Sequence, residues 1–505
     1  MMMRTRSTYL AIAIVIVYLI LAAACARTLM PWCDEAWFSG AAYNLVTHGY
    51  MGTPVLDPTA GWFIRDLTHI DRYTYWMVPL YPLSQAVWFQ FFRFGLMTVR
   101  MYSVVWGLAA LAAWFLVVKK ITGDTRIGLL TAALLATDFT FLWGAAVGRM
   151  DMMCEALGLG GIAAFLWLRQ KNLLLAILAS HACVAAAGLT HPMALGAWAA
   201  LIALTLYYDW RRIRIAHVAV AAVPYLIGAL AWGAYISKDP ALFWAQFSTN
   251  VGNRVVSGPA LHWLKMQIDD RYLYMFGLAP DTLGPSHLKI VVLAVYAAGL
   301  AGVLFNRQIR NDERFRPLLL LWLASMFMMA IVDKEIHHFY LLHFVDPLAA
   351  ILAVWLCWNW DTRSVPRWAL MSMVGILVLV QLTVLGSRIR QNRYSDSFLA
   401  ATEYLKQHAG PDDKIFGSAE LAFELGFEGH VVDDFRLGYR SGKRPAVVVL
   451  DQNRYQEWIP NLQQTEPSAY TYITSLLDRE FKLTYENTGY KIYLRNTTAP
   501  GAGAQ

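Results

Sequence analysis

Long apolar runs alternate with short polar loops along the first 390 residues of the chain. A run of about 20 apolar residues is long enough to cross a bilayer as a helix. The pattern predicts an α-helical polytopic membrane protein with about eleven membrane-spanning helices. We expect these helices near residues 9–26, 101–118, 127–147, 152–168, 172–189, 193–208, 215–236, 288–305, 317–332, 339–358 and 368–386.

The basic residues of this region gather in alternate loops, as is typical of the cytoplasmic side of a membrane. We therefore predict a multi-pass protein of the plasma (inner) membrane with a cytoplasmic N-terminus. An odd number of spans then leaves the C-terminus outside. The basic clusters are Arg4/Arg6, Lys119/Lys120/Arg126, Arg169/Lys171, Arg211/Arg212/Arg214, Arg307/Arg310/Arg314/Arg316 and Arg363/Arg367.

Two long outer loops result, at about residues 27–100 and 237–287. Residues 76–94 within the first loop are apolar enough for a twelfth span. Two prolines, polar interruptions and Arg93 favour a helix that lies in the membrane interface instead.

The composition changes after residue 390. Short helical and strand patterns, including the apolar run AVVVL and a closing hairpin-like stretch, predict a small extracytoplasmic α/β domain over residues 391–495. Residues 1–390 form the predicted transmembrane domain, and residues 496–505 are predicted to be a disordered tail.

Composition and charge agree with a membrane protein. Hydrophobic residues make up 57% of the chain and charged residues 15%, and the mean hydropathy is +0.41. These values exclude a single soluble domain. The net charge of +7 lies in short loops between apolar runs, so we expect no nucleic-acid partner. The five cysteines show neither zinc-ligand spacing nor a disulfide framework.

The clearest candidates for chemistry are acidic. Asp34 and Glu35 follow the first span, and a carboxylate there can act as general base on an acceptor hydroxyl. The simpler alternative is a solvated helix N-terminus, where acids are favoured. Arg149 and Asp151 lie at another predicted outer turn, either as part of the same site or as a local pair that supports the turn.

Other candidates could hold a lipid phosphate or a sugar ring at the membrane edge. Each has an ordinary alternative as a turn residue, a helix-end residue or a member of an aromatic belt. These candidates are Arg72, Tyr75, His191, Lys334, His337, His338 and Tyr340. The sequence contains neither GxGxxG after a strand nor GxxxxGK[ST], so an activated lipid phosphate suits the reaction better than a bound nucleotide.

Taken together, four stretches resemble the GT-C class of glycosyltransferases that use polyprenyl-phosphate sugars. The nearest resemblance is to bacterial relatives of protein O-mannosyltransferases and to the transferases that add aminoarabinose to lipid A. The stretches are residues 33–50 (CDEAWFSG and onward), 72–110, 148–161 (GRMDMMCEALGLGG) and 337–353 (HHFYLLHFVDPLAAILA). The α/β domain departs from the β-trefoil-like pattern of the eukaryotic protein mannosyltransferases.

The resemblance implies roles for several residues. Asp34 takes that of the catalytic base, and Asp151 that of the second acid, which orients the acceptor or assists a divalent cation. Glu35 is the neighbouring acid of the motif. Arg72, Arg149, Lys334 and His338 are candidates for the lipid phosphate.

The implied reaction is inverting transfer of a hexose or pentose from a polyprenyl-phosphate donor to a hydroxyl of a glycolipid, polysaccharide or protein. A transporter or flippase of a lipid-linked substrate is the chief alternative. A non-catalytic assembly component is a third interpretation.

Overall fold

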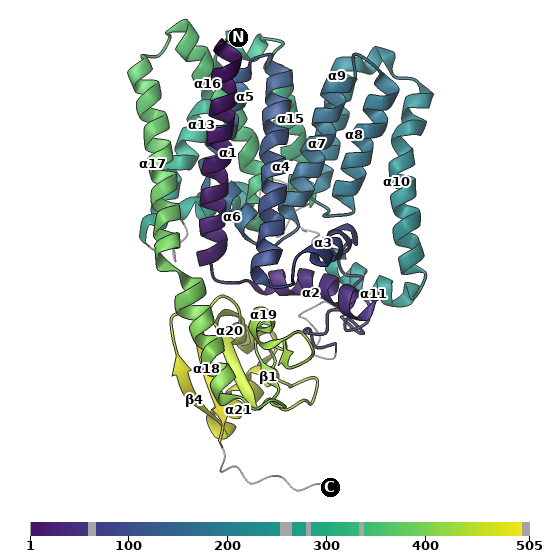
Figure 1. Ribbon diagram of the computed structural model, residues 1–505, viewed down its shortest axis with the longest axis vertical. Helices are drawn as coiled ribbons and strands as arrows, with labels where there is room; N and C mark the ends of the chain where they lie inside the picture. Colours follow the sequence, from purple (N-terminus) through teal and green to yellow (C-terminus); the bar gives the residue numbers. More distant parts are fainter. Residues whose placement is uncertain (1, 59–66, 253–264, 279–283, 333–337, 497–505) are drawn as a thin grey trace.

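A bundle of apolar helices contacts a smaller α/β domain at one end (Figure 1). The computed structural model describes residues 2–58, 67–252, 265–278, 284–332 and 338–496. The bundle helices are α1 (Met2–Thr28), α4 (Leu96–Thr122), α5 (Thr125–Thr137), α6 (Phe139–Ala146), α7 (Asp151–Leu168), α8 (Leu173–Gly188), α9 (Ala194–Asp209), α10 (Ile215–Ile236), α13 (Lys289–Phe305), α15 (Arg316–Val332), α16 (Leu342–Thr362) and α17 (Arg367–Gln391).

The bounds of these helices follow from local capping. Asp124 accepts a hydrogen bond from the amide of Arg126 and so begins α5. Asn172 does the same for α8 through the amide of Leu175. Gly123 ends α4 in the left-handed conformation, with φ of 70°, which a residue without a Cβ adopts at little cost.

Small residues allow the central helices to approach closely. A Cβ on Gly161 of α7 would lie 2.7 Å from the carbonyl oxygen of Ser180 on α8. A Cβ on Gly158 would lie 2.7 Å from the Cβ of Ala197 on α9. Such close packing is typical of helices inside membranes, and it brings α7 directly against α8 and α9.

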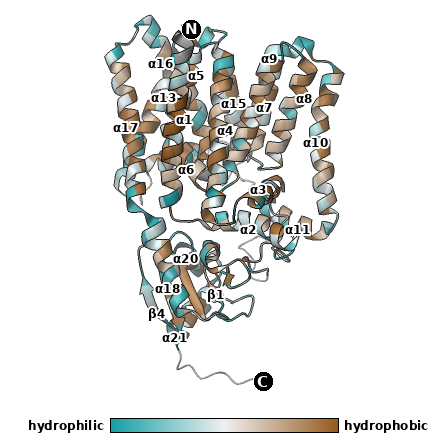
Figure 2. Ribbon diagram, viewed as in Figure 1, coloured by the Kyte–Doolittle hydropathy of each residue, from teal (hydrophilic) through white to brown (hydrophobic). Residues whose placement is uncertain are grey.

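All eleven predicted spans fall on helices, but the count of eleven membrane crossings is not confirmed. Among the described residues, seven helices are long and apolar enough to cross a membrane, or eight if the bent pair α5 and α6 is one span. Helices α8 and α15 are apolar but have only 16 and 17 residues. The apolar residues follow the bundle, as Figure 2 shows, and the protein is a multi-pass membrane protein.

One apolar segment is sharply bent inside the bundle. Helices α5 and α6 meet at an angle of 64°, and Asp138 separates them. Its carboxylate accepts hydrogen bonds from the amides of Thr140 and Phe141 at the start of α6. It also accepts from Tyr296 of α13 and Gln381 of α17, at 2.7 and 2.6 Å. A buried acid with these donors compensates for the interrupted helix.

Short helices lie where the bundle meets the α/β domain (Figure 1). They are α2 (Cys33–His48), α3 (Leu80–Phe91), α11 (Pro240–Gly252) and a π-helical segment, Gln267–Leu278. A fifth short helix, α14 (Arg307–Asn311), connects α13 and α15. With 12 residues, α3 is too short to span a bilayer, and the predicted interfacial segment contains this helix.

The C-terminal domain is a five-stranded sheet covered by helices. Strands β2, β1 and β3 run parallel, while β5 pairs antiparallel with both β3 and β4. The strands are β1 (Ile415–Phe416), β2 (Val431–Val432), β3 (Val447–Asp451), β4 (Phe481–Glu486) and β5 (Tyr490–Arg495), and the helices are α18 (Ala400–His408), α19 (Ala422–Leu425), α20 (Tyr455–Thr465) and α21 (Pro467–Glu480).

The apolar run of β3 is buried on both faces of the sheet. Val448 and Leu450 pack in a core with α20 and α21. Val447 and Val449 pack on the other face in a core that also contains Trp37 of α2. The α/β domain therefore shares a hydrophobic core with the first helix after α1. The predicted tail lies outside the described residues, apart from Asn496.

Candidate active site

Glu35 joins several segments at the end of the bundle that faces the α/β domain. Its buried side chain forms a two-point ion pair with Arg100 of α4, at 2.8 and 2.9 Å. It also accepts hydrogen bonds from the amides of Trp32 and Gly148. Arg100 in turn donates to the carbonyl of Ala26 in α1. Each carboxylate oxygen of Glu35 thus has one guanidinium donor and one amide donor, which occupy its acceptor sites.

Asp34 and Asp151 contact the same guanidinium. Asp34 lies in the first turn of α2 and pairs with Nη1 of Arg149. Asp151 begins α7 and accepts from Nε of Arg149 at 2.8 Å. The side chains of Arg149 and Asp151 are each 3% exposed, whereas that of Asp34 is 14% exposed. Asp34 is therefore the more accessible of the two carboxylates.

The backbone around Arg149 is held firmly. Its carbonyl accepts a hydrogen bond from Ser103 of α4, and its guanidinium lies 5.3 Å from the ring centroid of Phe38. Gly148 has no room for a side chain, since a Cβ there would come within 2.3 Å of Val99. Residues 148–151 and the first turn of α2 therefore contact each other through both side chains and backbone.

His191 and Tyr340 lie near this pair of turns. Both are buried, and their rings are 5.0 Å apart. Nδ1 of His191 accepts the amide of Met193, which orients the imidazole at the start of α9. Asp151 lies within electrostatic reach of His191 and His343. The structure thus brings His191 close to the acidic site, next to Tyr340.

The other predicted ligands are less closely connected to the site. Tyr75 is buried against Tyr235 of α10, with ring centroids 4.8 Å apart, and its amide donates to Gln246 of α11. Arg72 is exposed. Lys334 and His337 lie outside the described residues, and so does the side chain of His338.

Sequence reasoning missed two arginines. Arg100 is the partner of Glu35. Arg271, in the π-helical segment, is 1% exposed, and its guanidinium stacks 3.7 Å from the ring centroid of Phe344. Phe344 packs in one cluster with Tyr340. A basic residue directly before the aromatic residues of an outer loop was the available signal for Arg271.

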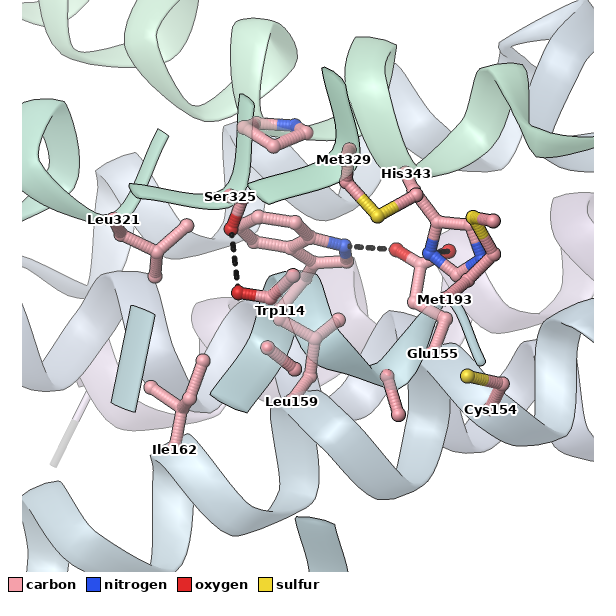
Figure 3. A pocket seen from close by; sticks show the side chains of 14 residues that line it. Trp114, Cys154, Glu155, Leu159, Ile162, Met193, Leu321, Ser325, Met329 and His343 are labelled. Atoms are coloured by element: carbon pink, nitrogen blue, oxygen red, sulfur yellow. Dashed lines mark hydrogen bonds and ion pairs between the residues drawn. The ribbon is translucent and has the colours of Figure 1, made fainter. Parts of the chain in front are cut away.

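A cavity lies inside the bundle, and residues of α4, α7, α9, α15 and α16 line it (Figure 3). Its empty volume is about 440 Å³, which includes space open to solvent. Glu155, one helical turn after Asp151, lies at its polar end, accepts from Trp114 at 2.9 Å and lies 4.0 Å from His343. Leu159 forms part of its apolar wall.

No three histidine, cysteine or acidic side chains are placed to hold a metal ion within the part of the chain that the structure describes. Asp151, the predicted metal-assisting acid, pairs with Arg149 instead.

Solved structures share this arrangement of helices and domain. ArnT from Cupriavidus metallidurans bound to undecaprenyl phosphate has a TM-score of 0.60 and 13% identity, covering 97% of this chain and 98% of that one. The same protein in the apo state has a TM-score of 0.52 and 15% identity over the same shares. The oligosaccharyltransferase of Archaeoglobus fulgidus in the apo form has a TM-score of 0.52 and 13% identity, covering 95% of this chain and 74% of that one.

These likenesses define the class of the fold. The chain has the GT-C fold of membrane-embedded glycosyltransferases, with a helical bundle and a small C-terminal sheet domain. No protein-family model matches the sequence, and a search of curated proteins finds no match either.

Proposed function

We propose that the protein is a membrane glycosyltransferase that moves a sugar from a polyprenyl-phosphate donor to a hydroxyl acceptor. The observation that carries this proposal is the sharing of Arg149 by Asp34 and Asp151, in a fold that ArnT also has. ArnT was crystallised with undecaprenyl phosphate, which supports a lipid-phosphate donor here. The sugar is a hexose or a pentose, and the acceptor is a glycolipid, a polysaccharide or a protein.

The reaction is an inverting displacement. Asp34, the more accessible acid, takes the proton of the acceptor hydroxyl. The acceptor oxygen forms a bond to the anomeric carbon while the bond from that carbon to the phosphate oxygen breaks. The electron pair of the broken bond stays on the lipid phosphate. Asp151 orients the site by holding Nε of Arg149.

Arg149 has two uses in this scheme. Its guanidinium pairs with both acids. A lipid phosphate that binds Arg149 competes with Asp34 for the guanidinium, so that a carboxylate oxygen of Asp34 becomes available to the acceptor. The same guanidinium then stabilises charge on the leaving phosphate. We assign Arg271 to the phosphate as well, while Arg72, Tyr75, His191, Lys334, His337, His338 and Tyr340 remain predicted ligands of phosphate or sugar.

Glu35 has a different role from Asp34. Arg100 and two backbone amides occupy the hydrogen-bond acceptor sites of its carboxylate. We therefore propose that Glu35 positions α2 rather than contacting the acceptor.

The test is mass spectrometry of envelope glycans and glycoproteins from cells that lack the gene. We expect one sugar modification to disappear, to return with the wild-type gene, and to stay absent or strongly reduced with Asp34→Asn. Loss of a positioned base lowers the rate about 10²- to 10⁴-fold. The variant must accumulate in membranes with the wild-type melting temperature. Full restoration by Asp34→Asn would reject Asp34 as the base.

A transporter or flippase is the second candidate, and the break between α5 and α6 favours it. However, the hydrogen-bond donors to the Asp138 carboxylate are groups of the protein itself, not of a transported substrate. Purified protein in proteoliposomes separates the two functions. Movement of a lipid-linked sugar without formation of a glycosidic bond would support transport and contradict transfer.

A further inference from the structure

The α/β domain contacts the helix that carries Asp34. Trp37 lies one turn after Asp34 in α2, and its indole Nε1 donates to Oδ2 of Asp433 at 2.9 Å. Asp433 directly follows β2 of the α/β domain. Trp37 is 4% exposed and Asp433 is fully buried. This hydrogen bond therefore joins α2 to the α/β domain and is shielded from solvent.

Asp433 is in turn fixed by its own domain. Its Oδ2 pairs with Arg454 at 2.6 Å and accepts the amide of Ala419 at 3.2 Å. Its Oδ1 accepts from the hydroxyl of Tyr455 at 3.0 Å. The guanidinium of Arg454 also lies 4.7 Å from the ring centroid of Trp37. Charged partners in a buried network tolerate little displacement, so the position of Trp37 is closely determined.

The same residue also binds the first long loop. The amide of Asp433 donates to the carbonyl of Val55 at 2.8 Å, and Leu56 forms a parallel bridge with Asp433. The loop thereby extends the sheet beyond β2. Nearby, Lys443 pairs with Asp57 at 2.8 Å. Backbone and side chain of Asp433 therefore hold two different parts of the membrane domain.

We propose that Trp37, Asp433 and Arg454 form a clasp through which the α/β domain sets the position of α2. The proposal rests on the proposed function, because its consequence for activity runs through Asp34. Glu35 anchors α2 to α4 on the bundle side, and the clasp anchors it on the domain side. A rotation of α2 would move Asp34 away from Arg149, so both anchors are needed to keep the base in place. The three residues of the clasp are positioning residues.

The test uses the full chain, in lipid nanodiscs and in cells, and removes a single hydrogen-bond donor. Trp37→Phe keeps an aromatic ring but removes the indole N–H, and it leaves the pair of Asp433 and Arg454 intact. Trp458→Phe is the matched control, because Trp458 also lies beside Arg454, at 4.8 Å, but belongs to α20. Hydrogen exchange of the amides of residues 34–39 and the melting temperature are measured for both variants in nanodiscs. The rate at which the envelope sugar appears after induction is measured for both in cells.

We expect Trp37→Phe to speed exchange in residues 34–39 about tenfold or more, since a hydrogen bond to a charged group is lost. We expect it to slow appearance of the sugar about tenfold to a hundredfold, since small displacements of reacting groups are costly. Trp458→Phe should match the wild type in both, with similar melting temperatures for the two variants.

Equal exchange in the two variants would overturn the clasp, and so would a wild-type rate of product formation in Trp37→Phe when Asp34→Asn is inactive. If Asp34→Asn also forms product at the wild-type rate, the proposed function fails, and the exchange of α2 alone then decides whether the clasp holds that helix. If Trp37→Phe does not accumulate, Trp37→Tyr replaces it, because it lacks the indole N–H as well.

Discussion

At the scale of the residue, two neighbouring acids have opposite surroundings. Asp34 is partly exposed and pairs with Arg149, which Asp151 also holds. Glu35 is buried and occupied by Arg100 and two amides. A buried acid paired in this way contributes to stability only as long as its partner remains. The adjacent side chains should therefore respond differently to the same substitution.

We expect Glu35→Gln to lower the free energy of unfolding by about 3–5 kcal/mol, because it leaves the buried charge of Arg100 without its counter-ion. Asp34→Asn is the matched control, since it makes the equivalent change one residue earlier. Thermal unfolding in detergent, followed by tryptophan fluorescence, measures both. Equal melting temperatures for Glu35→Gln and the wild type would contradict the anchoring role.

The sequence predicted Asp34, Arg149 and Asp151 as candidates, because ionisable groups at the ends of membrane spans are costly without a purpose. It could not assign Glu35 its partner. Arg100 follows 65 residues later, beside a predicted span, and nothing local connects the two. The roles of these residues in catalysis remain predictions that the variants above test.

The bend between α5 and α6 is held by one buried acid. Asp138 caps α6 and accepts from Tyr296 and Gln381 on two other helices. Helix α6 leads directly into the turn that carries Arg149. Asp138 thus fixes the start of the helix that leads into this turn.

We expect Asp138→Ala to be much more destabilising than Asp124→Ala, the matched change at the cap of α5. Asp124 lies at the exposed end of its helix and pairs locally with Arg126, so its loss should cost about 1 kcal/mol. Loss of Asp138 adds about 1–3 kcal/mol for each buried donor left without an acceptor. Unfolding of both variants in detergent with increasing denaturant measures the difference. Equal losses would mean that Tyr296 and Gln381 find other acceptors.

The positions of the helices could be predicted from the sequence, but the number of crossings could not. Apolar runs locate each segment because burial in lipid requires them. The break at Asp138 escaped detection, since residues 127–147 read as one continuous apolar run. The sequence patterns of the α/β domain predicted β3 and the hairpin of β4 and β5, but not the two-residue strand β2. The order of the strands in the sheet depends on contacts between distant segments.

Across the whole bundle, the two ends carry different charged side chains. The acidic site and the α/β domain lie at one end, and the N-terminus lies at the other (Figure 1). Basic side chains join helices at the N-terminal end, as in the pairs of Arg126 with Asp361 and Arg169 with Asp209. This polarity is the physical basis of the predicted orientation, because cytoplasmic loops retain Arg and Lys.

The orientation predicts that the site opens outside the cytoplasm, and cysteine labelling tests this directly. Lys482, in the α/β domain, and Lys171, at the basic end, are both exposed, whereas none of the five native cysteines is fully exposed. We expect a membrane-impermeant maleimide to label Lys482→Cys in intact cells, and to label Lys171→Cys only after the membrane is permeabilised. The reverse result would place Asp34 and Arg149 on the cytoplasmic side. A donor sugar presented in the outer leaflet could then not reach them, and the positive-inside pattern would have misled the assignment.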